Sequence, residues 1–331
     1  MATVTASTPL VGVTGSYAGI NYSGTFIPTL WSGKFNAKFY ATTVFGDIAN
    51  TDWQGEISGL GDKVVIQNVP DIGIADYTIG STLTYVPVTP GTIEMQIDRA
   101  KSFNFPIHDV LVAQSKPNQM EMFSNDASMQ MKIAIDRDIL VGTSTRQGVW
   151  NAVAAANQGA TAGVLSGAYN LGTAAAPIAL SSAGAALDTI LKMAAVLDEQ
   201  NVPEEGRWLL IDPATRQALM NTNLANALQM GDDKSMVRNG KVGMIDRFQV
   251  YVSNLLPRAA ATQDYFGAAA AGTAKRRLIL AGHKSAITFA SQLVKTESIR
   301  NPNDFGDLVR GLNVYGYKVV KDTALTSALV A

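Results

Sequence analysis

The stretch Asn239–Pro257, NGKVGMIDRFQVYVSNLLP, contains the glycines and the lysine that a phosphate-binding loop would use. Such a loop needs the spacing G-x-x-x-x-G-K-[ST], because backbone N–H groups cradle the phosphates and the hydroxyl binds magnesium. Gly240 and Lys241 fit, but Ser235 occupies the earlier glycine position and Val242 the hydroxyl position. A dinucleotide loop follows a strand and opens a helix, whereas this stretch leads into an alternating apolar segment. The sequence therefore predicts a turn followed by a strand.

Other residues that could carry catalysis are sparse. The chain has no cysteine, which excludes disulfides, thiolate catalysis and zinc–thiolate sites. Its two histidines, His108 and His283, lie far apart in sequence, and neither belongs to a metal-binding or catalytic motif. We assign both histidines structural roles. The sequence predicts no catalytic, metal or cofactor site, and hence no enzyme.

Composition restricts the partners. The 331 residues are 47% hydrophobic and 16% charged, with a net charge of -1. Proteins that grip duplex DNA carry a strong basic bias, since affinity comes largely from neutralising phosphates. A low charged fraction suits a globular protein whose surface is partly covered by partners. No window of 18 uninterrupted apolar residues is present, and the N-terminus lacks the pattern of a signal peptide, so we expect no membrane association.

A long β-hairpin is expected in the first third of the chain. GLGDKVVIQNV places a turn before a strand, and GTIEMQIDRAKSFNFPI alternates, with Ile93, Met95 and Ile97 on one face. The segment between them is β-prone but broken by proline and glycine. Because an isolated hairpin is marginal in water, this one needs a surface to lie on, in its own subunit or in another.

Helical and α/β patterns follow. An apolar stripe of helical spacing predicts a long helix over residues 119–141, which could continue past Gly142 and Gly148. Residues 158–179 predict a loop, and Ser181 or Ser182 a cap for the next helix. RWLLID predicts a strand, and Asp212-Pro213 opens another helix. The last strands do not suit a doubly wound sheet, so we expect an α+β fold in which they rejoin an earlier element.

This order of elements resembles the major capsid proteins of tailed double-stranded DNA bacteriophages, which share the HK97-type fold. The resemblance is carried by four ordered stretches, DWQGEISGLGDKVVIQNVPDIGIADYT, IEMQIDRAKSFNFPIHDVLVAQ, RWLLIDPATRQALM and GKVGMIDRFQVYVSNLLP, within residues 52–320. It implies an N-terminal arm (1–50), within which the pattern of Phe35, Phe39 and Tyr40 predicts a short helix. An extended β-hairpin loop follows (51–90), then a peripheral domain with a long spine helix (91–157 and 300–331) and an axial α/β domain (158–299).

The resemblance also implies a function. Subunits would assemble as hexamers and pentamers into an icosahedral head, formed in the host cytoplasm and present in the virion. Expected partners are other copies of the chain, a separate scaffolding protein, a portal, decoration proteins and, weakly and without sequence specificity, the packaged DNA. The charged residues that we select as candidates for contacts between subunits are Asp62, Lys63, Asp71, Arg99, Asp246 and Arg247.

Three alternatives stay open from the sequence. An encapsulin-type compartment shell would have the same fold and would co-purify with cargo peptides. An α/β nucleotide-binding enzyme could be built on residues 181–282, although it would lack a phosphate loop. A tail or baseplate protein would form tubes or rings instead of closed shells.

Overall fold

The computed structural model describes most of the chain. The described residues are 16–17, 20–21, 41, 43–53, 63–70, 72–74, 76–80, 82, 85, 87–109, 119–142, 148–180, 184–220, 243–258, 276–302 and 304–331. The expected short helix near Phe35, Phe39 and Tyr40 lies outside them. The two-residue strands β1 (Ser16–Tyr17) and β2 (Ile20–Asn21) pair near the N-terminus. The four-residue helix α1 (Phe45–Ile48) follows.

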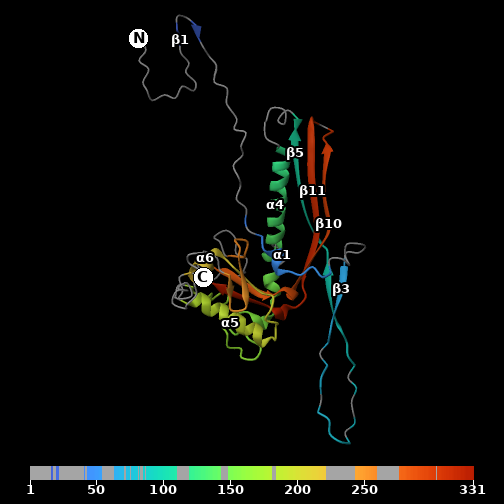
Figure 1. Cartoon of the computed structure of the whole chain (residues 1–331), viewed down its shortest axis with the longest axis vertical. Helices are drawn as coiled ribbons and strands as arrows, with labels where there is room; N and C mark the ends of the chain where they lie inside the picture. The colour runs from blue at the N-terminus through green and yellow to red at the C-terminus, as the bar shows by residue number, and fades with distance from the viewer. Residues whose placement is uncertain are drawn as a thin grey trace.

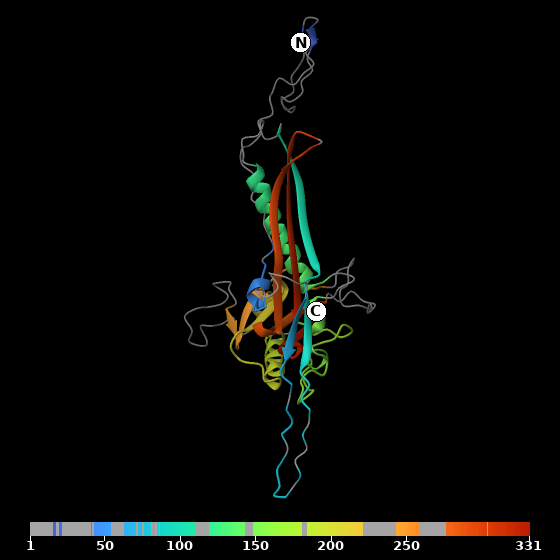
Figure 2. The same cartoon turned by 90° about the vertical axis from the view of Figure 1, so that its right-hand side faces the viewer.

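An elongated sheet forms one half of the molecule (Figures 1 and 2). Strands β5 (Arg99–His108), β10 (Ile287–Arg300) and β11 (Gly306–Val319) pair antiparallel in the order β10-β11-β5. Helix α4 (Gln119–Leu140) runs along this sheet, and Phe123 meets Phe105 of β5 edge-on, with 6.1 Å between ring centroids. The prediction that C-terminal strands rejoin an earlier element is confirmed by the pairing of β11 with β5.

Helix α4 is shorter than the sequence allowed. It ends at Leu140, and the residues after Gly148 form two short 3-10 turns, Val149–Ala152 and Ala155–Asn157. The helix predicted over residues 119–141 is therefore confirmed, and the possible continuation past the two glycines is wrong. The chain folds back against the helix end, so closely that a Cβ on Gly148 would lie 2.4 Å from the carbonyl oxygen of Leu140.

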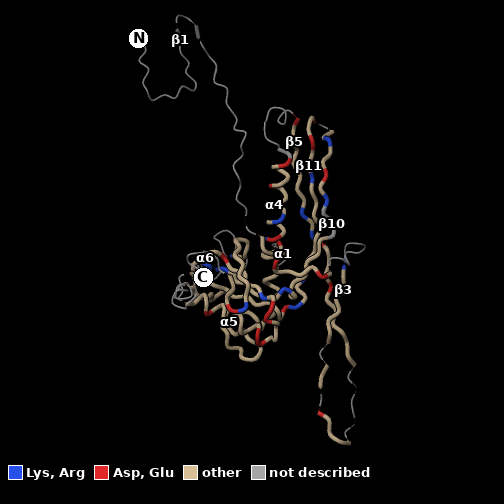
Figure 3. The backbone as a smooth tube through the Cα atoms, viewed as in Figure 1, with Lys and Arg blue, Asp and Glu red and all other residues tan. Residues whose placement is uncertain are grey.

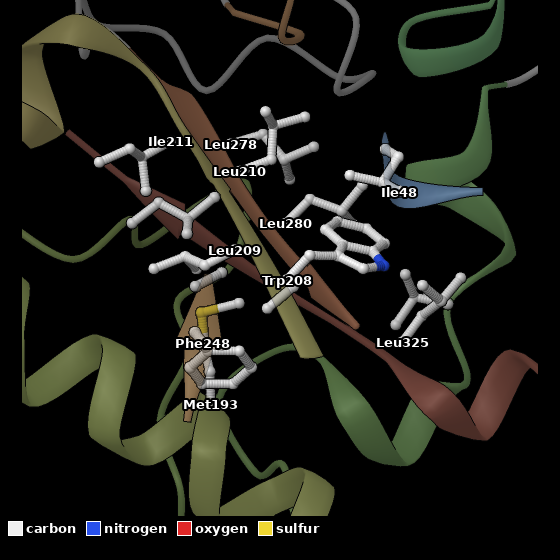
Figure 4. Packing of buried hydrophobic residues seen from close by; sticks show 14 of the residues in the cluster. Ile48, Met193, Trp208, Leu209, Leu210, Ile211, Phe248, Leu278, Leu280 and Leu325 are labelled. Carbon is white, nitrogen blue, oxygen red and sulfur yellow. The ribbon is translucent and has the colours of Figure 1, made fainter. Parts of the chain in front are cut away.

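A five-stranded sheet forms the second half. Its strand order is β12 (Leu325–Val330), β9 (Arg277–His283), β6 (Arg207–Ile211), β8 (Phe248–Val252) and β7 (Met244–Ile245). Helices α5 (Ala185–Glu199) and α6 (Pro213–Met220) accompany it. The central strand β6 is buried along its whole length, as its continuous apolar run predicts. Figure 4 shows Leu209 of β6 pointing towards Met193 and Phe248 in the main core.

Local signals predicted the start of α6 but not that of α5. Asp212 caps α6, because its Oδ1 accepts a hydrogen bond of 2.9 Å from the backbone N–H of Thr215. Helix α5 begins at Ala185 with Gly184 in the cap position, so the prediction that Ser181 or Ser182 caps it is wrong. The expected irregular loop at 158–179 is present as turns and bridges, and Ile178 pairs with Val330 at the edge of β12.

Two strands pair outside the ranges predicted for them. The family resemblance grouped residues 300–331 with the spine helix, but β12 pairs with β9 of the five-stranded sheet. It also grouped residues up to 299 with the axial unit, but β10 pairs with β11 in the three-stranded sheet. The reason is that β10 and β11 form one hairpin of 14 residues on each side, so the chain crosses between the sheets before and after that hairpin.

Candidate assembly surface

The predicted hairpin is present and projects from the body of the protein. Strands β3 (Lys63–Asn68) and β4 (Gly91–Gln96) pair antiparallel, with Lys63 opposite Gln96. In Figures 1 and 2 the chain beyond these strands extends well past the rest of the molecule. Residues 69–90, which we call the hairpin loop, contain no lysine or arginine, and their only carboxylates are Asp71 and Asp76. Figure 3 shows how little charge this part of the chain carries.

The hairpin loop exposes large apolar side chains. Ile74 and Ile79 are each 98% exposed. More than half of every large apolar side chain that the structure describes here is exposed: Val69, Ile72, Ile74, Tyr77, Ile79, Tyr85 and Val88. Contiguous apolar surface of this kind marks a site of association in soluble proteins.

The base of the hairpin is fixed by a small core of its own. Ile66 of β3 and Met95 of β4 are buried against Ile97, Ala290 and Val320, separately from the main core. The base is therefore held by the C-terminal strands, while the hairpin loop has no such support among the residues that the structure describes. This arrangement suits an element that reaches another molecule.

A buried polar network joins α4 to the long sheet. Asp138 Oδ2 accepts hydrogen bonds of 2.7 Å from Arg99 Nη1 and from the Tyr315 hydroxyl. The Arg99 guanidinium lies 4.3 Å from the centre of the Tyr317 ring. Burial raises the pKa of Tyr315, and it raises the pKa of Tyr317 to about 12, so both hydroxyls stay protonated at neutral pH. The network fixes the end of α4 on the sheet.

Asp136, close to this network on the same helix, holds the chain at α1. Its two carboxylate oxygens accept hydrogen bonds from the backbone N–H groups of Val44 (3.1 Å) and Phe45 (3.0 Å). The side chain is buried, and burial raises its pKa to about 6, although the two N–H donors offset part of that shift. Asp136 therefore connects the exit point of the N-terminal segment to the long helix. The sequence showed this carboxylate without indicating a partner.

Arg247 reaches back to its own subunit. Asp246 has a left-handed backbone (φ 48°), and the Arg247 guanidinium lies 2.8 Å from Asp198 and 2.7 Å from Glu204. Asp198, near the C-terminal end of α5, is also 2.7 Å from Arg207. The turn before β8 is thus tied to α5 by ion pairs and holds no phosphate-binding pattern.

Comparison with known proteins identifies the family. The model of the phage capsid protein family matches residues 99–328. The chain belongs to the phage capsid protein family. Solved structures with a similar fold include one from Mycobacterium phage Che8, at 24% identity and a TM-score of 0.69, covering 93% of this chain and 98% of that one. The capsid structure of the Cyanophage P-SCSP1u aligns at 19% identity and a TM-score of 0.66, covering 92% and 93%.

A third similar structure is the capsid of an empty GTA particle, at 14% identity and a TM-score of 0.63, covering 92% of this chain and 95% of that one. No curated protein sequence matches the chain. These structures confirm the HK97-type α+β fold that the sequence resemblance implied. The capsid protein is a structural component of the virion and not an enzyme.

The structure places four of the six interface candidates. Lys63 forms an exposed ion pair of 2.5 Å with Glu94 of the same hairpin. Arg99 forms an ion pair with Asp138 of its own subunit. Arg247 forms one with Asp198, also in its own subunit, and Asp246 lies beside Arg247. The last two candidates, Asp62 and Asp71, lie outside the described residues. Contacts of all six with a neighbouring subunit stay a prediction.

The histidines of the capsid protein have structural surroundings. His108 lies 3.1 Å from Asp304 near the tip of the long sheet. His283 hydrogen-bonds Ser285 and the carbonyl of Glu205, and desolvation lowers its pKa. Within the described ranges, no group of three or more acidic or histidine side chains could hold a metal ion, and no helix has the length and hydropathy to cross a membrane.

Proposed function

We propose that the capsid protein assembles with copies of itself, as hexamers and pentamers, into the icosahedral head that encloses double-stranded DNA. The observation that carries this proposal is the hairpin loop, whose apolar side chains find no partner in their own subunit among the described residues. Covering them on a neighbouring subunit would bury area worth about 25 cal/mol per Å² before ordering costs. Many modest contacts of this kind close a shell while each remains reversible.

The elements divide between the parts of such a shell. Residues 1–50 are the arm and 51–90 the loop that lies across an adjacent subunit. Residues 91–157 with the C-terminal segment 300–331 make up the peripheral domain, and 158–299 the axial domain, except that β10 and β12 go with the sheets in which they pair. The peripheral domain then contains α4 and the long sheet, and the axial domain contains α5 and the five-stranded sheet.

The remaining partners follow from charge and from the family. With a net charge of -1, the chain would contact packaged DNA weakly and without sequence specificity. A separate scaffolding protein and a portal direct assembly in the host cytoplasm, and decoration proteins can bind the finished shell. Faithful assembly of the chain alone in an expression host would argue against the separate scaffold.

Negative-stain microscopy of the purified protein tests the assembly. With its scaffolding protein present, the wild type should form closed shells. The double variant Ile74→Asp/Ile79→Asp should reduce particle yield at least about tenfold, because both side chains are fully exposed in the subunit and charge opposes their burial. The matched control Ile74→Val/Ile79→Val keeps the apolar surface and should assemble. Monodisperse wild-type monomers, even with the phage's scaffolding protein present, would refute the proposal.

A further inference from the structure

A short closed loop, Ala162–Tyr169, ends in two exposed aliphatic side chains. Ala162 and Tyr169 exchange backbone hydrogen bonds of 2.8 and 3.0 Å, and Gly167 N–H donates to the Gly163 carbonyl at 3.1 Å. At the tip, Leu165 is 80% exposed and Val164 is more than half exposed. The loop thus presents apolar side chains to solvent from a backbone that is hydrogen-bonded to itself.

Glu199, the last residue of α5, holds the tip of this loop in place. Its Oε2 accepts hydrogen bonds from the backbone N–H groups of Leu165 (2.9 Å) and Ser166 (3.4 Å), and these donors keep the pKa of Glu199 below its ordinary value. Gly163 has φ 109°, and a Cβ there would lie 2.8 Å from the same oxygen. A tip fixed in this way loses little conformational entropy when it binds.

Helix α5 carries further apolar side chains on the side of Glu199. Leu191 and Ala195 lie two turns and one turn before Glu199 on the same side of the helix, and Leu191 is 48% exposed. We call Val164, Leu165, Leu191 and Ala195 the α5 strip. Its side chains come from the loop and from α5. Leu165 and Leu191 do not belong to the hydrophobic core of the subunit.

Several charges near the α5 strip are paired within the subunit, whereas the Glu199 carboxylate is held by backbone N–H groups. Asp188 pairs with Lys192 at 2.5 Å, and Asp198 pairs with Arg207 and Arg247. A surface whose charges are mostly paired has little attraction for a polyanion over distance. It suits contact with another apolar, weakly charged surface, and the hairpin loop shows that this chain carries such surfaces.

We propose that the α5 strip is a contact between copies of this chain in the assembled shell, with Leu165 as its central anchor. The proposal rests on the proposed self-assembly and adds a second contact to the hairpin loop. Figures 1 and 2 support the assignment, because the yellow-green loops that precede α5 lie towards the end of the molecule to which the hairpin extends. A copy that receives the hairpin loop on that side would also face the α5 strip.

The absence of cysteine allows a direct test. In the variant Leu165→Cys the new thiol is the only one in the chain, so its rate of reaction with a maleimide reports the exposure of this position alone. The thiol should react at least about tenfold more slowly in assembled particles than in dispersed subunits. A thiol-anchored photocrosslinker at the same position should yield covalent dimers of the chain.

A charge variant gives the second measurement. Leu165→Asp should lower particle yield at least about tenfold while the melting temperature of dispersed subunits changes by no more than about 2 °C, since an exposed substitution perturbs folding little. The volume-conserving control Leu165→Met should assemble.

The outcomes separate the two proposals. If particles form and the thiol of the Leu165→Cys variant reacts equally fast in both states, the α5 strip is not a contact and self-assembly stands. If protection appears only in DNA-filled particles, the partner is DNA, and the inference is overturned. If the wild type forms no particles even with its scaffolding protein, self-assembly and the α5 contact fall together.

Discussion

Replacing Asp136 with asparagine should remove a pH dependence from the stability of the subunit. The carboxyl is buried, and burial raises its pKa from the ordinary value of 3.8 to about 6. Below about pH 4 the group is protonated in both the folded and the unfolded chain. As the pH rises through 6 the folded chain must bury an ionised carboxylate, so the stabilisation that the neutral acid contributes at low pH is lost. The difference between the two pKa values corresponds to about 3 kcal/mol.

The assay is thermal unfolding of dispersed subunits at intervals from about pH 3 to about pH 7.5, which spans both pKa values. For a chain of this length, about 3 kcal/mol corresponds to about 4 °C. The melting temperature of Asp136→Asn minus that of the wild type should therefore be about 4 °C larger near pH 7 than near pH 3. The asparagine amide also places a donor against the N–H of Val44 or Phe45, which lowers the melting temperature of the variant at every pH. The test therefore uses the change of the melting-temperature difference with pH and not its absolute value.

An exposed carboxylate provides the control. Asp188→Asn removes a charge that is paired with Lys192 on the surface of α5, and such pairs contribute up to about 1 kcal/mol. Its melting curve should follow the wild type within about 1 °C at every pH. If Asp136→Asn runs parallel to the wild type over the whole pH range, then Asp136 titrates normally, and burial does not govern this carboxylate.

Four further substitutions test the packing that supports the assembly surface. Leu210→Ala, at a fully buried position in β6, should cost about 2–5 kcal/mol in urea denaturation, and a cost below about 1 kcal/mol would show that the core collapses around the cavity. Trp208→Phe should cost clearly less, because within the described residues the buried indole N–H has no hydrogen-bond acceptor, a defect worth about 1–3 kcal/mol that phenylalanine removes. Gly316→Ala should lower the melting temperature by at least about 2 °C, since its Cβ would lie 2.4 Å from a backbone carbonyl of β4; an unchanged melting temperature would mean that the two strands can separate. Arg99→Lys should cost about 1–2 kcal/mol through the lost stacking and the weaker bond to Asp138, and equal stability would show that charge alone suffices there.

The sequence predicted the parts of the fold whose signals are local. The apolar run of β6, the Asp212-Pro213 start of α6 and the alternation in β4 all lie within a few residues of the structure that they specify. The pairing of β12 with β9 has no such signal. The sequence predicted the strand β9 but not the strand β12, and the choice of partner depends on which sheet has a free edge once the chain has folded.

The candidate site followed the same division. The exposed hairpin loop was predictable, because a hairpin of apolar side chains is recognisable from its own residues. The interface candidates Arg99 and Arg247 were chosen as isolated charges near strand ends. Their partners Asp138 and Asp198 lie 39 and 49 residues away, and only the folded chain brings them together. The partners of Asp136 could not be predicted for the same reason, because its carboxylate oxygens bind backbone groups 91 and 92 residues distant.

The placement of charge explains how one chain can be both a stable subunit and a reversible building block. The best-buried ion pairs join elements of the same subunit, as Arg99 with Asp138 and Arg207 with Asp198 do. Side chains that are already paired within the subunit do not form ion pairs with a neighbouring subunit. The two surfaces proposed for association, the hairpin loop and the α5 strip, are apolar, and apolar contacts tolerate small changes of angle better than paired charges do. Since hexamers and pentamers differ in the angle between neighbours, a subunit built in this manner can occupy both positions with the same surfaces.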